Sequence, residues 1–184
     1  MSGAIALVVL SSCFVAFSIA SFRHFSKGVA SRGNVLIRVL TVAATLGNLL
    51  AALISWPVQP ELAWISVVAG ILSLALFQAA IRSTAAGELH VAFTGKGPDR
   101  LVTRGIYGWI RNPFYTSYLI YWAAWVPATN LYMPSLAVLG VFVVLYWIAV
   151  RDEERFLRMY FGDQYVAFQA RTGRFLPRLR MLRS

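Results

Sequence analysis

A short polar run, Arg111-Asn112-Pro113, stands directly before an apolar segment. Asn is a favoured N-cap residue, and Pro suits the first helical position because its missing N–H needs no partner there. The run therefore predicts a helix N-terminus, where backbone amides and the helix dipole form a site for a carboxylate or phosphate. Arg111 adds a positive charge to that site. The alternative is an ordinary capped membrane helix with an interfacial arginine, which the cap alone favours.

Three adjacent acids, Asp152, Glu153 and Glu154, follow an apolar segment that ends at Val150. Carboxylates at the end of a membrane span are costly unless they are paired or functional. A carboxylate can accept hydrogen bonds from the two hydroxyls of a ribose, or it can balance a cationic ligand. The alternative is a solvated helix start in which the acids pair with neighbouring arginines. The acids alone leave both interpretations open.

Few other residues in the chain could do chemistry. His24 and His90 are the only histidines, and Cys13 is the only cysteine. No cluster of His, Cys, Asp and Glu has metal-ligand spacing, so we expect no metal site, and no nucleophilic-serine motif or phosphate-binding glycine loop is present. Glu88 and His90 could transfer a proton, although a role as ordinary loop residues is favoured.

The composition indicates that a membrane surrounds the elements that carry these residues. The 184 residues are 59% hydrophobic and 13% charged, whereas soluble domains are about 45–50% apolar and about 25% charged. A disordered chain and a disulfide scaffold are excluded by the apolar content and by the single cysteine. We therefore expect an all-α integral membrane protein with about five transmembrane helices, of which the fourth is short for a span. The expected spans are residues 4–21, 35–56, 62–81, 114–128 and 132–150.

The basic residues predict which side of the membrane each connection occupies. All 17 Lys and Arg lie between the first and second spans, between the third and fourth, or in the tail, if Arg38 at the start of the second span is counted with the first group; the net charge is +10. The other two connections, residues 57–61 and 129–131, contain none. Because basic loops stay in the cytoplasm, we expect the N-terminus outside and the tail inside, in the inner membrane of a bacterium. The charge thus reflects topology and contact with membrane lipids, and we expect no nucleic-acid partner.

The tail also contains a predicted surface helix. Phe156, Leu157, Tyr160 and Phe161 are spaced as one helix face, and Gly162 is an expected stop. We expect this helix to lie on the cytoplasmic face of the membrane.

Taken together, the polar blocks resemble the isoprenylcysteine carboxyl methyltransferase family and its phospholipid methyltransferase relatives. The resemblance covers about residues 99–179, and the first three spans match only in being spans. Each motif alone is weak, but their order and spacing are specific. The motifs are Leu-Val-Thr-x-Gly-x-Tyr at 101–107, Arg-Asn-Pro-x-Tyr at 111–115, Glu-Glu at 153–154, Tyr-Phe-Gly-Asp-Gln-Tyr at 160–165 and Arg-Phe-Leu-Pro at 174–177.

The resemblance implies methyl transfer from S-adenosylmethionine to a lipophilic acceptor within the membrane. Glu153, with Glu154 beside it, would hold the adenosine or ribose side. Arg111 suits the methionine carboxylate, and Arg111 or Arg151 could orient a carboxylate acceptor. Arg151 and Glu154 are therefore the catalytic candidates. The implied cofactor-binding residues are Leu101, Val102, Tyr107, Asn112, Pro113, Tyr115 and Glu153.

One departure from the family's pattern concerns the acceptor. Enzymes tied most closely to prenylcysteine usually carry His where this chain has Asn112, and Asn cannot titrate near neutral pH. The acceptor is therefore open among a prenylcysteine-like carboxylate, a phospholipid amine and a phenolic lipid. A carboxylate needs no general base, whereas an amine or a phenol does. The candidate bases are Glu88, His90, Asp152, Glu153 and Glu154.

We interpret residues 1–184 as a single domain, with a three-span part at 1–82 and a cofactor-binding part at 83–184. Two other interpretations stay open. Membrane sterol reductases share a similar C-terminal region and bind a nicotinamide cofactor such as NADPH, although the chain is short for their usual span count. A small basic membrane protein could also act as an anchor or assembly partner on anionic lipid, which would leave the motif spacing unexplained.

Overall fold

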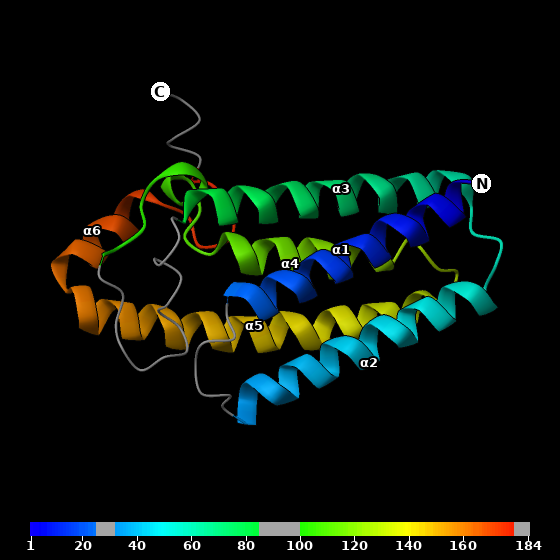
Figure 1. Cartoon of the computed structure of the whole chain (residues 1–184), viewed down its shortest axis with the longest axis horizontal. Coiled ribbons are helices and arrows are strands. Elements are labelled where there is room, and N and C mark those ends of the chain that lie inside the picture. Colours follow the sequence, from blue (N-terminus) through cyan, green and yellow to red (C-terminus); the bar gives the residue numbers. More distant parts are fainter. Residues whose placement is uncertain (25–31, 85–99, 179–184) are drawn as a thin grey trace.

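The computed structural model describes residues 1–24, 32–84 and 100–178 (Figure 1). In this part of the chain there is no β-strand, and a single bridge pairs Ile110 with Gly173. The expectation of an all-α fold is therefore confirmed. The elements are α1 (Ser2–His24), α2 (Arg32–Ile54), α3 (Pro60–Ser83), the short 3-10 helix η1 (Gly105–Gly108), α4 (Pro113–Trp125), α5 (Tyr132–Phe161) and α6 (Asp163–Arg171).

Proline and glycine set several helix boundaries. Pro60 and Pro113 each occupy the first turn of their helix, as their fixed φ and missing N–H favour. Gly162 separates α5 from α6 and has a φ of +52°, a conformation that residues with a Cβ rarely adopt. Its role as a stop is confirmed.

Within the residues that the structure describes, four helices are long and apolar enough to cross a membrane: α1, α2, α3 and α5. They correspond to four of the five predicted segments. The remaining segment forms α4, which has 13 residues. Such a helix is about 20 Å long, whereas the hydrocarbon core of a bilayer is about 30 Å thick. The count of five spans and the orientation of the chain stay predictions.

The C-terminal half of the chain differs from the expectation in one respect. The acids after Val150 do not begin a new helix, because α5 continues without a break to Phe161. No Gly or Pro lies between Val150 and Phe161, and Arg155 pairs with Asp152 along the exposed surface of the helix at 3.3 Å. The predicted surface helix at 156–161 is therefore the last part of α5. The separate C-terminal helix is α6, which begins at Asp163.

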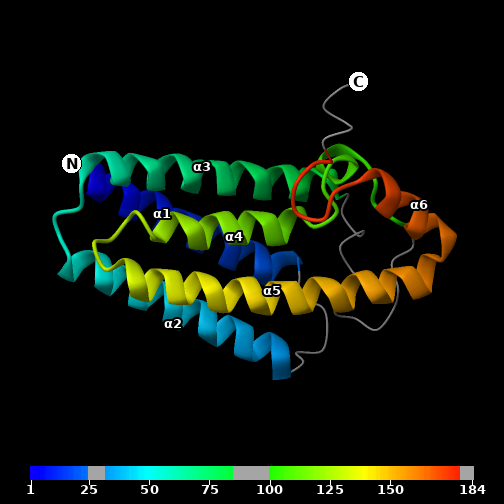
Figure 2. The ribbon, with the colours of Figure 1, turned by 180° about the vertical axis from the view of Figure 1, so that it is seen from behind.

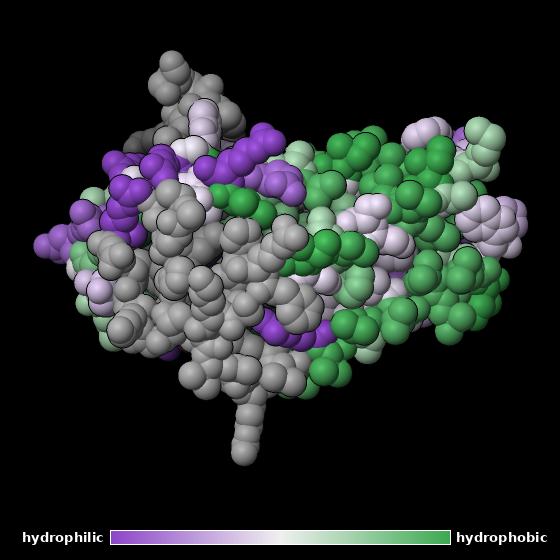
Figure 3. All heavy atoms as spheres, viewed as in Figure 1, coloured by the Kyte–Doolittle hydropathy of each residue, from purple (hydrophilic) through white to green (hydrophobic). Residues whose placement is uncertain are grey.

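The helices form a bundle whose two ends differ in polarity. Helix α3 contacts α1 and α4, α4 also contacts α5, and α2 contacts α5 at an angle (Figure 2). The short η1, α6 and the last turns of α5 gather at the end opposite the N-terminus. Hydrophilic residues collect at this end, whereas the face of the other end is largely hydrophobic (Figure 3). The predicted site residues thus lie at the polar end.

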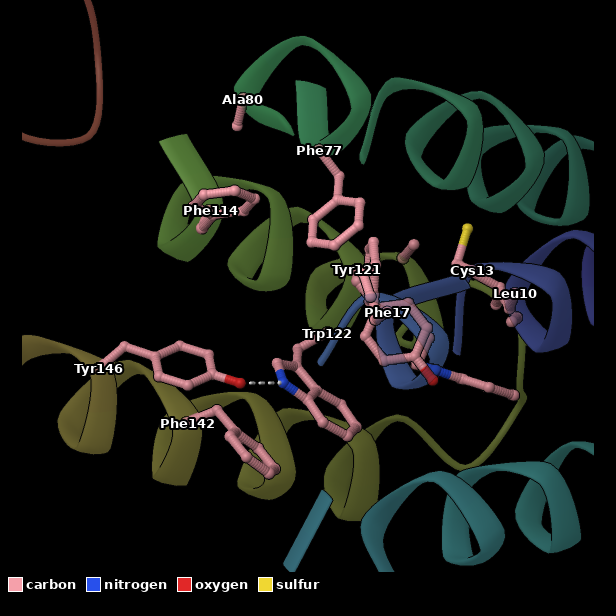
Figure 4. Packing of buried hydrophobic residues seen from close by; sticks show 14 residues of the cluster. Leu10, Cys13, Phe17, Phe77, Ala80, Phe114, Tyr121, Trp122, Phe142 and Tyr146 are labelled. Atoms are coloured by element: carbon pink, nitrogen blue, oxygen red, sulfur yellow. Dashed lines mark hydrogen bonds between the residues drawn. The ribbon is translucent and has the colours of Figure 1, made fainter. Parts of the chain in front are cut away.

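Aromatic side chains from four helices fill the core of the bundle (Figure 4). Trp122 of α4 stacks on Phe142 of α5 with ring centroids 4.1 Å apart, and its indole N–H donates to the Tyr146 hydroxyl at 3.3 Å. Phe17 of α1 packs against Phe77 of α3 at 4.5 Å. This packing fixes α4 between its neighbours and so fixes the start of α4.

Candidate active site

A bent segment of backbone after α6, residues 172–176, is hydrogen-bonded to the entry to α4. The amide of Arg111 donates to the carbonyl of Gly173 at 2.8 Å, and Gly173 donates back to the carbonyl of Trp109 at 3.1 Å. The amide of Asn112 donates to the carbonyl of Arg174 at 3.2 Å. A Cβ atom on Gly173 would overlap the carbonyl of Leu176, so this position requires glycine. We call residues 172–176 the C-terminal strap.

Glu154 is the centre of a buried ion cluster. Its side chain is 4% exposed. One carboxylate oxygen accepts from Arg111 Nε at 3.0 Å and from Asn112 Nδ2 at 3.1 Å. The other accepts from Arg174, with the shorter distance 2.7 Å, and from Gln169 Nε2 at 3.4 Å. Because a buried carboxylate is stable only when it is paired and hydrogen-bonded, this cluster ties α5, α6, the strap and the entry to α4 together.

The two arginines of the cluster have further contacts. Arg111 also donates to the carbonyls of Gln169 and Thr172. The guanidinium of Arg174 lies over the Trp147 ring, 5.0 Å from its centroid. The charge of Arg111 is therefore already matched by Glu154, and its predicted role in binding a substrate stays a prediction. The same holds for the predicted catalytic role of Glu154, whose oxygens are fully engaged.

Glu153 has a different environment from its neighbour. Successive residues of an α-helix point about 100° apart, so Glu153 faces α4 where Glu154 faces the strap. The Tyr115 hydroxyl donates to Glu153 Oε2 at 3.1 Å. Glu153 is enclosed by protein yet keeps some accessible surface. The structure thus brings together two of the residues predicted to bind a cofactor, and it leaves one carboxylate oxygen of Glu153 without a described partner.

Tyr107 completes this side of the site from η1. Gly105 opens η1 with a φ of +57°, and the Ile106 amide donates to Ser83 Oγ at 3.1 Å, which seats η1 on the end of α3. Burial raises the pKa of Tyr107 well above its ordinary value, and the nearby Glu153 raises it further. The Tyr107 hydroxyl therefore stays protonated and can act as a hydrogen-bond donor.

Asn112 stands at the predicted N-cap position, and Pro113 opens α4 as expected. The expected capping hydrogen bond, in which Asn112 Oδ1 would accept from a first-turn amide, is absent. The side chain is held instead through its Nδ2, which donates to Glu154 and to the Arg174 carbonyl. The bond to the Glu154 carboxylate is charge-assisted and therefore strong, and it fixes the orientation of the Asn112 side chain. The first-turn amides of α4 consequently have no side-chain cap, which keeps the helix N-terminus suited to an anion.

The remaining predicted residues lie at the margins. Leu101 and Val102 are half-buried in the segment that leads into η1. Arg151 is exposed, and among the described residues it has no hydrogen bond or ion pair. Because Arg151 and Glu153 are two residues apart in one helix, their side chains point about 200° apart. The predictions for Glu88 and His90 lie outside the described residues.

Sequence reasoning assigned no role to Arg174, Gln169 or Trp147. Arg174 belonged to a recognised motif, but nothing in its sequence position indicates that it reaches an acid twenty residues earlier. A possible signal was the acidic pair itself, since a buried carboxylate beside a span needs cations. In the described part of the chain, no group of three His, Cys, Asp or Glu could hold a metal ion.

The comparisons with known proteins agree with this geometry. A family model described as phospholipid methyltransferase matches residues 62–164, which contain α3 from its third residue on, η1, α4, α5, and both Glu153 and Glu154. The match covers more than half of the chain. The chain belongs to the phospholipid methyltransferase family. The match begins within α3, so the family's region includes most of this helix as well as the polar motifs.

Individual relatives point to the same family. Proteins named protein-S-isoprenylcysteine O-methyltransferase are similar to this chain. The one from Homo sapiens is 30% identical over 134 residues, 67% of this chain and 45% of the relative. The one from Tribolium castaneum is 27% identical over 130 residues, 66% of this chain and 45% of the relative. The one from Xenopus laevis is 25% identical over 179 residues, 85% of this chain and 61% of the relative. The resemblance predicted from the motifs is confirmed, and the chain spans less than half the length of the first two relatives.

Proposed function

We propose that this protein is a methyltransferase that uses S-adenosylmethionine to methylate a carboxylate on a lipophilic, prenylcysteine-like acceptor within the membrane. The observation that carries the proposal is the hydrogen bond from Tyr115 to Glu153, which joins the start of α4 to an enclosed acid with one oxygen still available. Family membership supports methyl transfer over the reductase and anchor interpretations. S-Adenosylmethionine, when bound, would supply an activated methyl group.

The residues around Glu153 fit such a cofactor. The free oxygen of Glu153 suits ribose hydroxyls, and the uncapped first turn of α4 suits the methionine carboxylate. The Tyr107 ring offers a partly accessible surface and a protonated hydroxyl beside Glu153. In this proposal Leu101 and Val102 line the approach from the segment before η1. Glu154 and Arg111 are positioning residues, because their buried pairing holds the start of α4 at the correct place.

The acceptor would arrive from the apolar part of the bundle. A carboxylate acceptor forms an oxygen–carbon bond while the sulfur–carbon bond breaks, the electron pair stays on sulfur, and no proton has to move. The protein's task is then to orient two reactants and exclude water, which supplies much of the rate in such displacements. This agrees with a site in which the Tyr107 hydroxyl stays protonated and is no base.

Isothermal titration of the full chain in detergent tests cofactor binding. We expect S-adenosylmethionine to bind, and Glu153→Ala to weaken binding by about tenfold or more, since a hydrogen bond to a charged group is lost. Asp152→Ala is the matched control, because Asp152 is exposed and pairs only with Arg155 among the described residues. Unchanged binding in Glu153→Ala, or binding of NADPH but not of S-adenosylmethionine, would overturn the proposal.

A second acceptor class is favoured by the description of the matching family, which names phospholipids. An amine must lose a proton at some stage, and Glu153 is the enclosed acid nearest to the proposed cofactor site. Incubation with methyl-labelled S-adenosylmethionine separates the classes when an S-prenylcysteine, an aminophospholipid and a phenolic lipid are supplied in parallel. Label recovered as a base-labile ester identifies a carboxylate, and stable label on the phospholipid identifies an amine.

We further propose that the chain is a single domain in the inner membrane of a bacterium, with the polar end in the cytoplasm. All basic residues of the connections would then lie on one side. A reporter fused to the C-terminus tests the orientation. If the C-terminus is cytoplasmic, a reporter that is active only outside the cytoplasm should be inactive in this fusion.

A further inference from the structure

Tyr118 lies one helical turn deeper in the bundle than Tyr115, on the same side of α4. Its ring packs against rings from three other helices: Phe17 of α1 at 5.2 Å, Phe77 of α3 at 5.9 Å and Tyr146 of α5 at 5.8 Å. The ring is therefore fixed in position, as the orienting part of a binding site must be.

The Tyr118 hydroxyl differs from those of Tyr115 and Tyr146, the tyrosines on either side of it that have hydrogen-bond partners. Tyr115 donates to Glu153, and the hydroxyl of Tyr146 accepts from Trp122. Within the described residues the Tyr118 hydroxyl has no hydrogen-bond partner, and it is not among the polar atoms that are fully buried. Protein surrounds the side chain, yet part of it stays accessible. Because enclosed hydroxyls in native proteins almost always find a partner, this one is available as a donor to a ligand or to water.

The location of this hydroxyl limits the chemical class of ligand that could bind to it. The proposed cofactor site, at Tyr107, Tyr115 and Glu153, lies on the side of this hydroxyl that faces the polar end. Towards the other end stands the apolar packing of Trp122 against Phe142. A lipophilic acceptor would place its reactive group where these two regions meet, with its apolar part in the bundle or bilayer. A neutral phenol at that junction is a donor for an acceptor's oxygen.

We propose that Tyr118 orients the methyl acceptor by donating its hydroxyl hydrogen to the acceptor's carboxylate. One carboxylate oxygen is held by Tyr118, and the other attacks the methyl carbon. This inference rests on the proposed function and adds the residue that selects the acceptor. Tyr118 is then a binding residue for the acceptor and takes no part in holding the cofactor.

Tyr118→Phe tests the proposal, because it removes only the hydroxyl and keeps the ring packing. The probes are N-acetyl-S-farnesyl-cysteine, which carries the free carboxylate, and its methyl ester, which does not. Competition binding to the full-length protein in detergent gives the ratio of the two dissociation constants. We expect the wild-type protein to prefer the carboxylate and Tyr118→Phe to reduce that preference about tenfold, the typical effect of one hydrogen bond to a charged group. The KM for the carboxylate should rise while binding of S-adenosylmethionine stays unchanged.

Tyr121→Phe is the matched control. Tyr121 lies in the same helix and is buried, but its hydroxyl bonds to Thr45 at 3.1 Å. Tyr121→Phe should lower the melting temperature, because this hydrogen bond is lost, and it should leave the preference for the carboxylate over the methyl ester unchanged. An unchanged preference in Tyr118→Phe, with cofactor binding and turnover intact, would show that the hydroxyl binds only water and overturn this inference alone. Absence of cofactor binding in the wild-type protein would instead overturn the proposed function.

Discussion

The Tyr115 hydroxyl donates to Glu153 across 3.1 Å, and this contact joins the first turn of α4 to the polar end of α5. The two residues are 38 positions apart in sequence, and the α4–α5 connection lies at the opposite end of the bundle. The contact therefore depends on the packing of the whole length of α4 against α5. Because the hydroxyl occupies one oxygen of Glu153, it also fixes the direction of the other.

Tyr115→Phe should weaken binding of S-adenosylmethionine about five- to tenfold, because Glu153 loses the donor that orients it. The ring contact with Tyr146, at 5.6 Å, would be kept, so the melting temperature should change little. Titration calorimetry in detergent measures the affinity. Tyr160→Phe, an exposed tyrosine near the end of α5, serves as the control and should bind as the wild type does. Equal affinities for wild type and Tyr115→Phe would contradict the role given to this contact.

Glu154→Ala should destabilise the protein by about 3–5 kcal/mol, because Arg111 and Arg174 would be left near each other without their shared carboxylate. Chemical denaturation in detergent measures the loss. Asp152→Ala breaks an ion pair in which both side chains are about two-thirds exposed, and such pairs contribute about 0–1 kcal/mol. A similar effect of both substitutions would mean that the buried cluster does not hold the polar end together.

The helices and the start of α4 could be predicted because local signals encode them. Pro113 restricts its own backbone, and Gly162 supplies the left-handed conformation that ends α5. The continuation of α5 through the acids could not be seen from local polarity, since a polar stretch inside a helix and a polar stretch at a helix start have the same composition. Only tertiary contacts to Glu154 distinguish the two cases.

The separate environments of Glu153 and Glu154 could not be predicted from the sequence either. Both were predicted as neighbours on the adenosine or ribose side, but adjacent helical residues point in different directions. Glu154 lies at the strap with Arg174, a residue whose reach depends on the turn made by α6. Long-range pairing of this kind follows from how elements pack and leaves no periodic signal.

Gly173→Ala should damage the site from a distance. The added methyl group would overlap the carbonyl of Leu176, so the C-terminal strap must shift away from the entry to α4. We expect a lower melting temperature together with weaker binding of S-adenosylmethionine, since the strap anchors both Arg111 and Asn112.

Gly140→Ala provides the contrast for that experiment. Gly140 lies within α5, and a Cβ there would meet no atom within 4 Å. Alanine favours a helix over glycine by about 1 kcal/mol, so Gly140→Ala should be neutral or stabilising. If Gly173→Ala behaved in the same way, the strap would have no part in forming the site.

Helix α2 is joined to the bundle by a few polar contacts, and Ser135→Ala tests one of them. Ser135 Oγ lies 2.7 Å from Asn48 Oδ1, and both side chains are buried. Hydrogen bonds between helices inside a membrane contribute about 0.6 kcal/mol on average and about 1.7 kcal/mol at most. We expect a loss of stability near the upper value, because Asn48 Nδ2 already has no hydrogen-bond partner within the described residues.

Ser12→Ala, which removes a hydroxyl that bonds only within α1, should reduce the free energy of unfolding by less in the same measurement. Because α2 contacts α5 far from the polar end, neither change should alter binding of S-adenosylmethionine, and a loss of binding in Ser135→Ala would mean that α2 helps to position the site.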